Sequence, residues 1–278
     1  MESPAEHASL APAGVTPAAP LRRPGIWSGL GIVALYFALQ FGLSILIGIV
    51  IGAGVMMRAG IVAGVQHRKL HIHAIMQALR TNPDMRVVLT VITIAVAAAI
   101  MAALVRQFWP GQWSRAELPG FGFTRPRSPL AYVAAAGLAI VVMLIGGVIA
   151  RLAAHGHPFH QDVTVMASEV PLDLRILLAL LVVCVAPFVE ELVFRGVLLS
   201  GLARRMPIAW AVVVSAVIFG CAHLPDFKFA WYPIPALFLL GLLLAWLRVR
   251  TGSIWPSITA HATNNFIAAL AWFLAAHH

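Results

Sequence analysis

Long apolar runs separated by short polar stretches dominate the chain from residue 26 onward. An α-helix needs about 20 apolar residues to cross about 30 Å of hydrocarbon, and the runs have this length or come close to it. They cover residues 26–52, 87–105, 130–150, 175–200, 207–224, 233–247 and 254–275. The pattern predicts an all-α protein, a polytopic transmembrane helical bundle of about seven or eight spans.

The composition supports the same fold class. The chain of 278 residues is 61% hydrophobic and 10% charged, with a mean hydropathy of +0.91. Soluble domains contain about 25% charged residues. The composition therefore excludes an ordinary soluble domain and predicts an integral membrane protein.

The net charge of +9 comes mostly from arginines in short loops. Under the positive-inside rule, the basic loops 106–129, 201–206 and 248–252 face the cytoplasm, and the C-terminus lies on the other side. Membrane lipid headgroups rather than nucleic acid are the partner that this charge indicates. Seven spans would place the basic segment 53–86 outside the cytoplasm, so this segment lies on the membrane surface or the chain has an eighth span.

The runs divide the chain into three regions. Residues 1–24 are rich in Ala and Pro and are expected to form a disordered tail. Residues 25–169 form an N-terminal transmembrane region with an amphipathic, interfacial segment near 58–86. Its first run is longer than the core of a cleavable signal peptide and indicates an anchor. Polar residues inside apolar runs gather in the third region, residues 170–275.

Two other groups of residues suggest metal or thiol chemistry. His67, His71 and His73 could ligate a metal, but structural zinc usually has three or four converging ligands, so a basic stripe facing headgroups is the preferred interpretation. The role of this cluster stays open. Cys184 and Cys221 lie inside predicted spans, and small buried hydrophobic residues are the default interpretation.

The sequence PFVEELVFRG, residues 187–196, places three charged side chains inside an apolar run. Each costs about 2.5–3.5 kcal/mol near a bilayer centre, so the group needs compensating interactions or a function. Two later runs also carry polar residues, and all three contain a pair at positions i and i+4, which share one helix face. The pairs are Glu191 with Arg195, Phe219 with His223, and His261 with Asn265.

The first pair differs from the neighbouring Glu190. Glu191 and Arg195 are spaced for an ion pair within one helix, which indicates a structural role. Glu190 lies about 100° further round the helix, has no partner there, and is a candidate general acid or base. Phe219 is predicted to pack one turn below His223. The spacing from His261 selects Asn265 over Asn264.

The segments EELVFR, FGCAH and HATNN resemble the three motifs of the CAAX-protease and bacteriocin-processing family of intramembrane proteases. These are two glutamates with an arginine four after the second, a Phe with a His four later, and a His with an Asn or Asp four later. All three occur in order within roughly residues 170–275.

The resemblance implies a helical bundle around a polar intramembrane cavity. In this scheme Glu190 and His223 activate a water for attack on a peptide carbonyl, and His261 and Asn265 stabilise the oxyanion. Glu191, Arg195 and Phe219 support the site. The implied substrate is a peptide or a membrane protein, with a prenylated C-terminal peptide as one candidate, and the expected location is the bacterial cytoplasmic membrane.

The family has been described both as metal-dependent and as metal-free. Glu190, His223 and His261 could together ligate a divalent metal such as zinc. No HExxH pair is present, so metal-free hydrolysis is the preferred hypothesis.

Two alternatives to a peptidase stay open. A non-catalytic membrane scaffold or bacteriocin-immunity-type protein would be favoured by degenerate motifs, but the motifs here are intact. A proton-coupled transporter could also use intramembrane Glu and His residues. Transporters often show interrupted helices in paired halves, whereas the polar groups here lie in the C-terminal half.

Overall fold

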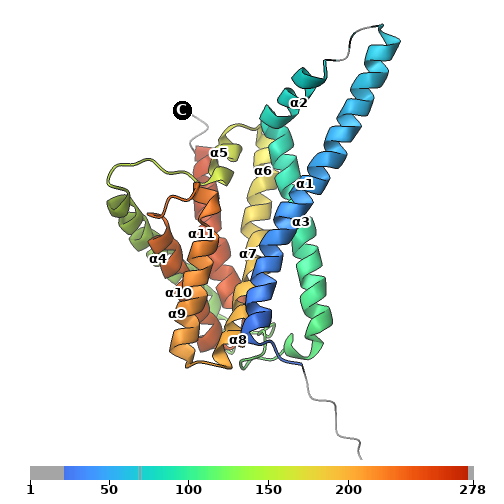
Figure 1. Ribbon diagram of the computed structural model, residues 1–278. Coiled ribbons are helices and arrows are strands. Elements are labelled where there is room, and N and C mark those ends of the chain that lie inside the picture. Colours follow the sequence, from blue (N-terminus) through green and yellow to red (C-terminus); the bar gives the residue numbers. More distant parts are fainter. Residues whose placement is uncertain (1–21, 68, 70, 275–278) are drawn as a thin grey trace, which may run out of the picture.

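The computed structural model describes residues 22–274 except 68 and 70, and this part of the chain is helical and contains no strand (Figure 1). The predicted all-α class is confirmed. The principal helices are α1 (Ile26–Val65), α2 (Ile72–Thr81), α3 (Pro83–Phe108), α4 (Leu130–Ala154), α5 (Asp162–Ser168), α9 (Ile208–Ala222), α10 (Ile234–Thr251) and α11 (Trp255–Leu274).

A continuous helical segment over Leu172–Ala203 passes through the centre of the bundle. Two stretches of this segment are π-helical rather than α-helical, and π-helical turns are frequent at functional sites. Its successive parts are α6 (Leu172–Leu180), η2 (Leu181–Val185), α7 (Ala186–Glu191), η3 (Leu192–Leu198) and α8 (Leu199–Ala203). Every residue of η3 is buried, so this segment forms the middle of the core.

Five helices in the described residues are long and apolar enough to cross a membrane: α1, α3, α4, the Leu172–Ala203 segment and α10. The other two predicted spans are also helical. One, α9, is apolar but only 15 residues long, and the other, α11, has 20 residues and carries the polar side chains of the third motif. The polytopic helical bundle predicted from the apolar runs is therefore confirmed.

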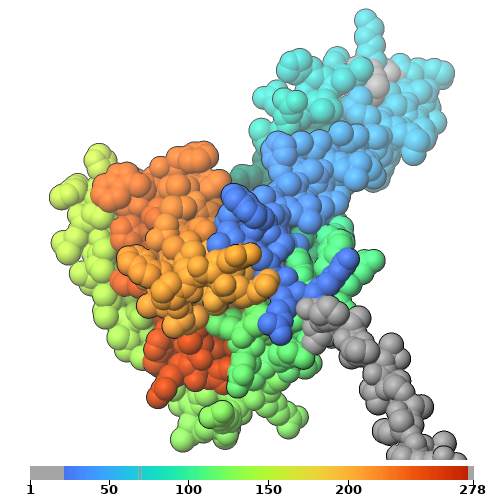
Figure 2. Space-filling model, turned by 60° about the horizontal axis from the view of Figure 1, so that its bottom comes forward, coloured from blue at the N-terminus to red at the C-terminus, as the bar shows by residue number. Residues whose placement is uncertain are grey.

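The first helix is longer than predicted. It continues through residue 65 rather than ending at 52, because residues 53–65 are apolar or small except for Arg58 and contain no proline. At 1.5 Å per residue, α1 is about 60 Å long. Its first part packs on η3 and α3, while its last part and α2 project from the body as an arm (Figure 2). The segment near 58–86 is thus divided among α1, α2 and α3, and most of the predicted tail 1–24 lies outside the described residues.

The three loops predicted to share one side of the membrane lie together at one end of the bundle, at the bottom of Figure 1. Hydrogen bonds connect two of them to each other and to the start of α11: the buried Arg248 donates to the carbonyls of Ala116 and Gly120, and the Ser253 hydroxyl donates to the carbonyl of Thr124. The loop between α4 and α5 lies at the opposite end.

The prediction that the two cysteines are buried is wrong. Cys184 and Cys221 are both exposed, and neither forms a disulfide. In a membrane bundle the outer face of a helix contacts lipid, which is as apolar as a protein core. An apolar context therefore does not show which face of a helix is buried.

Candidate active site

The three motif pairs lie on three elements that meet inside the bundle. Glu190 and Glu191 end α7, His223 directly follows α9, and His261 lies in the second turn of α11. At 1.5 Å per residue, Glu190 lies about 20 Å and His223 about 22 Å along their helices from the turn at 204–207, so the two residues reach the same depth. The short α9 ends at the site instead of crossing the whole bundle.

Glu190 faces two histidines from other helices. Its Oε2 atom lies 3.7 Å from Nε2 of His223 and 3.7 Å from Nε2 of His261. Both separations exceed the 2.7–3.2 Å of an ordinary hydrogen bond. Oε2 is also buried and has no hydrogen-bond partner among the described residues. Three polar atoms therefore border one small space without satisfying one another.

A backbone carbonyl fixes the ring of His223. Its Nδ1 lies 2.8 Å from the Phe219 carbonyl oxygen, which can only accept a hydrogen bond. Nδ1 therefore carries a proton and donates it, and in the neutral ring Nε2 is an acceptor. Nε2 is the atom that faces Glu190.

A buried carboxylate fixes the ring of His261. Nδ1 of His261 lies 3.0 Å from Oε1 of Glu191, and the same oxygen accepts a hydrogen bond from Nη1 of Arg195 at 3.1 Å. Arg195 also donates to the Gly241 carbonyl, and neither charged side chain is exposed. The predicted ion pair is confirmed. Its additional contact with His261 was missed, because that partner is 70 residues further along the chain.

Phe219 packs one turn below His223, as predicted, with the two ring centroids 4.7 Å apart. The ring is fully buried and meets the rings of Phe194 and His261 edge to face, with centroids 5.2 and 5.6 Å apart. The guanidinium carbon of Arg195 lies 4.3 Å from its centroid. The Phe219 ring therefore covers the guanidinium of Arg195 with an aromatic face.

One N–H of the Asn265 side-chain amide is hydrogen-bonded to the backbone. Its Nδ2 donates to the carbonyl of Val182 in η2 at 2.9 Å, and its Oδ1 accepts a hydrogen bond from Nδ2 of Asn264 at 3.2 Å. Since a side-chain amide has two N–H groups, one remains for another acceptor. Both asparagines line the same cavity as Glu190.

A cavity of about 230 Å³ is lined by the four predicted catalytic residues, Glu190, His223, His261 and Asn265. Several polar residues from outside the three motifs also line it: Tyr36, Gln40, Thr90, Gln161, Asp162 and Asp226. A larger groove of about 770 Å³ between α1, α2 and α3 contains none of the motif residues. The smaller cavity is therefore the candidate active site.

Asp226, in the short helix η4 (Pro225–Phe227), makes part of this cavity acidic. Burial raises the pKa of its carboxyl group, and the negative charges of Glu190 and Asp162 add to this shift. No sequence pattern indicated this residue, because a lone aspartate in a loop is common.

The described residues contain no group of three or more His, Cys, Asp or Glu side chains arranged to hold a metal ion. Glu190, His223 and His261 are not among such groups as they are placed. His67, His71 and His73 are exposed on the arm and likewise do not form such a group.

Residues 172–267 match the family model described as "Type II CAAX prenyl endopeptidase Rce1-like". A Bacillus subtilis protein named "Putative membrane peptidase YdiL" is 32% identical to this chain over 81 residues, which cover 29% of this chain and 31% of that protein. The match thus spans about a third of the curated relative. No solved structure matches the chain. The matched segment contains all three motifs, whereas α1 to α5 precede it.

Proposed function

We propose that this chain, whose residues 172–267 form an Rce1-like CAAX prenyl endopeptidase domain, is an intramembrane endopeptidase that uses Glu190 and His223 to activate water. The family and the related membrane peptidase support a peptidase in general terms. The observation that carries the specific proposal is the unpartnered Oε2 of Glu190, which faces Nε2 of two histidines inside a polar cavity within the described part of the chain.

A water placed between Glu190 and His223 would meet two acceptors. The Glu190 carboxylate accepts one of its hydrogens, and Nε2 of neutral His223 accepts the other. The oxygen lone pairs then remain directed toward the substrate. As the water attacks the peptide carbonyl carbon, its proton passes to Glu190, the proposed general base. The same group can return this proton to the leaving amine.

His261 and Asn265 are the proposed partners of the developing oxyanion. Nδ1 of His261 is directed at Glu191, so Nε2 can donate only when both ring nitrogens carry a proton, and the Glu191 carboxylate would then balance the charge. Asn265 has one uncommitted N–H among the described residues. Donors at the site where negative charge develops usually provide the largest electrostatic contribution to acyl transfer.

The proposed substrate is a peptide segment that reaches the cavity within the membrane. The family match supports a peptide substrate. We extend this to peptides or membrane proteins, including prenylated C-terminal peptides, and to the bacterial cytoplasmic membrane. The test is a cleavage assay on protein purified in detergent, using peptides with and without a prenyl group and mass spectrometry of the products. Products from the wild type but not from Glu190→Gln support the proposal, whereas equal product from both contradicts it.

Metal removal provides a separate prediction. We expect purified protein to contain less than one zinc per chain and to keep its cleavage activity in a chelator, because its candidate ligands in the described residues do not form a metal-binding group. Metal analysis and assays before and after chelation measure this. One tightly bound metal per chain, with activity lost on removal and restored by re-addition, would contradict it.

A further inference from the structure

Tyr36 brings a polar group to the candidate active site from outside the Rce1-like segment. It lies on α1, far before residue 172, yet it lines the same cavity as Glu190, His223 and His261. The side chain is 2% exposed, and its ring belongs to the main apolar core. The folded bundle therefore places a phenol hydroxyl from the N-terminal region beside the motif residues.

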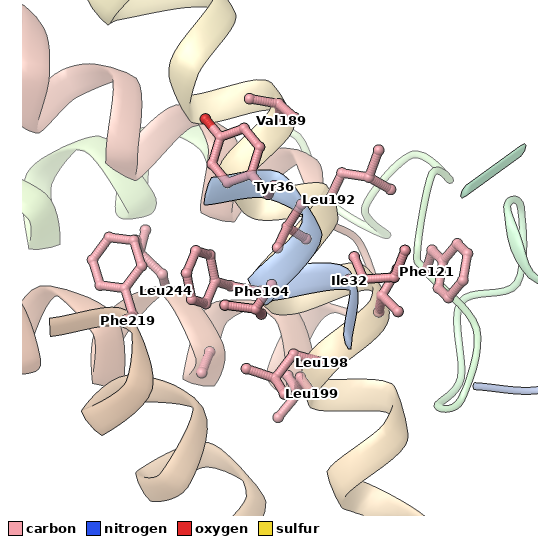
Figure 3. Packing of buried hydrophobic residues seen from close by; sticks show 14 of the residues in the cluster. Ile32, Tyr36, Phe121, Val189, Leu192, Phe194, Leu198, Leu199, Phe219 and Leu244 are labelled. Carbon is pink, nitrogen blue, oxygen red and sulfur yellow. The ribbon is translucent and has the colours of Figure 1, made fainter. Parts of the chain in front are cut away.

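The hydroxyl of Tyr36 has no hydrogen-bond partner among the residues that the structure describes, although the hydroxyl of a buried tyrosine usually finds one. Figure 3 shows the ring at the border of the apolar cluster, with its oxygen pointing away from Phe194 and Leu192. A phenol donor that lines a cavity and has no partner among the described residues can donate to a ligand in that cavity.

The surroundings favour a donor rather than an acceptor role. The charged side chains Glu190 and Asp226 line the same cavity as Tyr36, and both are acidic. A phenol keeps its proton at neutral pH and can donate it to an oxygen atom. The Tyr36 hydroxyl does not donate to Oε2 of Glu190, which has no hydrogen-bond partner among the described residues. It is therefore available to an oxygen atom of the substrate.

The two other candidate donors to the oxyanion, His261 and Asn265, each have one N–H already used in a hydrogen bond within the protein. Nδ1 of His261 is occupied by Glu191, and one N–H of Asn265 is occupied by Val182. An oxyanion in acyl transfer is typically stabilised by more than one preorganised donor. Building on the proposed peptidase function, we infer that Tyr36 is a further catalytic residue, whose hydroxyl donates a hydrogen bond to the carbonyl oxygen of the scissile peptide bond.

The test is Tyr36→Phe in the full-length protein, because this change removes the hydroxyl and keeps the ring in the core. We expect kcat for peptide cleavage to fall about 10²–10³-fold, the effect of removing one oxyanion donor, with KM nearly unchanged. The thermal unfolding temperature should match the wild type. The matched control is Tyr132→Phe on α4, whose ring lies outside the cavity and whose kinetics should not change.

The outcomes separate this inference from the proposed function. Wild-type kcat in Tyr36→Phe, or a raised KM with unchanged kcat, overturns the donor role. If Glu190→Gln is inactive in the same assay while Tyr36→Phe is fully active, only the inference about Tyr36 fails. If Glu190→Gln is active, the proposed water activation fails first.

Discussion

Glu190→Gln is expected to lower peptide cleavage by about 10²–10⁴-fold, the usual cost of losing a general base. The amide has nearly the same shape as the carboxylate but cannot accept a proton from water. The folded protein should be at least as stable as the wild type, because Oε2 of Glu190 has no hydrogen-bond partner to lose in the described residues and a buried charge is removed. Initial rates and thermal unfolding of the two purified proteins measure both effects.

His223 provides an internal check on this result. His223→Ala should fall into the same activity range, since Nε2 of His223 faces the same carboxylate oxygen. The double variant should be little worse than either single variant, because residues that act on one water are not additive. Cleavage by Glu190→Gln at near wild-type rate would remove the basis of the peptidase proposal and favour a non-catalytic scaffold.

Arg195→Ala is expected to destabilise the protein by about 3–5 kcal/mol, because it leaves the carboxylate of Glu191 buried without its counter-ion. Arg195 and Glu191 are both fully buried, and the guanidinium also donates to the Gly241 carbonyl and packs on the Phe219 ring. Folded yield in detergent should therefore fall more than activity per folded molecule. Size-exclusion yield, thermal unfolding and specific activity distinguish the two effects.

Arg86→Ala is the matched control for this prediction. Arg86 pairs with Glu169 at 3.2 Å, but both side chains are more than 40% exposed, and an exposed ion pair contributes about 0–1 kcal/mol. Glu191→Gln should also lower stability, since an amide cannot balance the charge of Arg195. An Arg195→Ala protein with normal yield and stability but no activity would show that Arg195 acts in the chemistry.

Local periodicity made much of the candidate site predictable. Residues at i and i+4 lie on one face of an α-helix, so the ion pair between Glu191 and Arg195 and the packing of Phe219 below His223 followed from spacing within single helices. The apolar runs predicted helices at all seven places because an apolar run long enough to cross a membrane forms a helix there. The high cost of charge in a membrane also singles out Glu190 from the sequence alone.

Contacts between residues that are far apart in the sequence could be identified only from the tertiary structure. The 3.7 Å approach of Glu190 to two histidines, the second partner of Glu191, and the entry of Tyr36 into the cavity all join residues on different helices. No local pattern encodes the rotation of one helix against another. Lipid and protein core are also equally apolar, so the sequence determined which segments are helices, and only side-chain packing decided which faces turn inward.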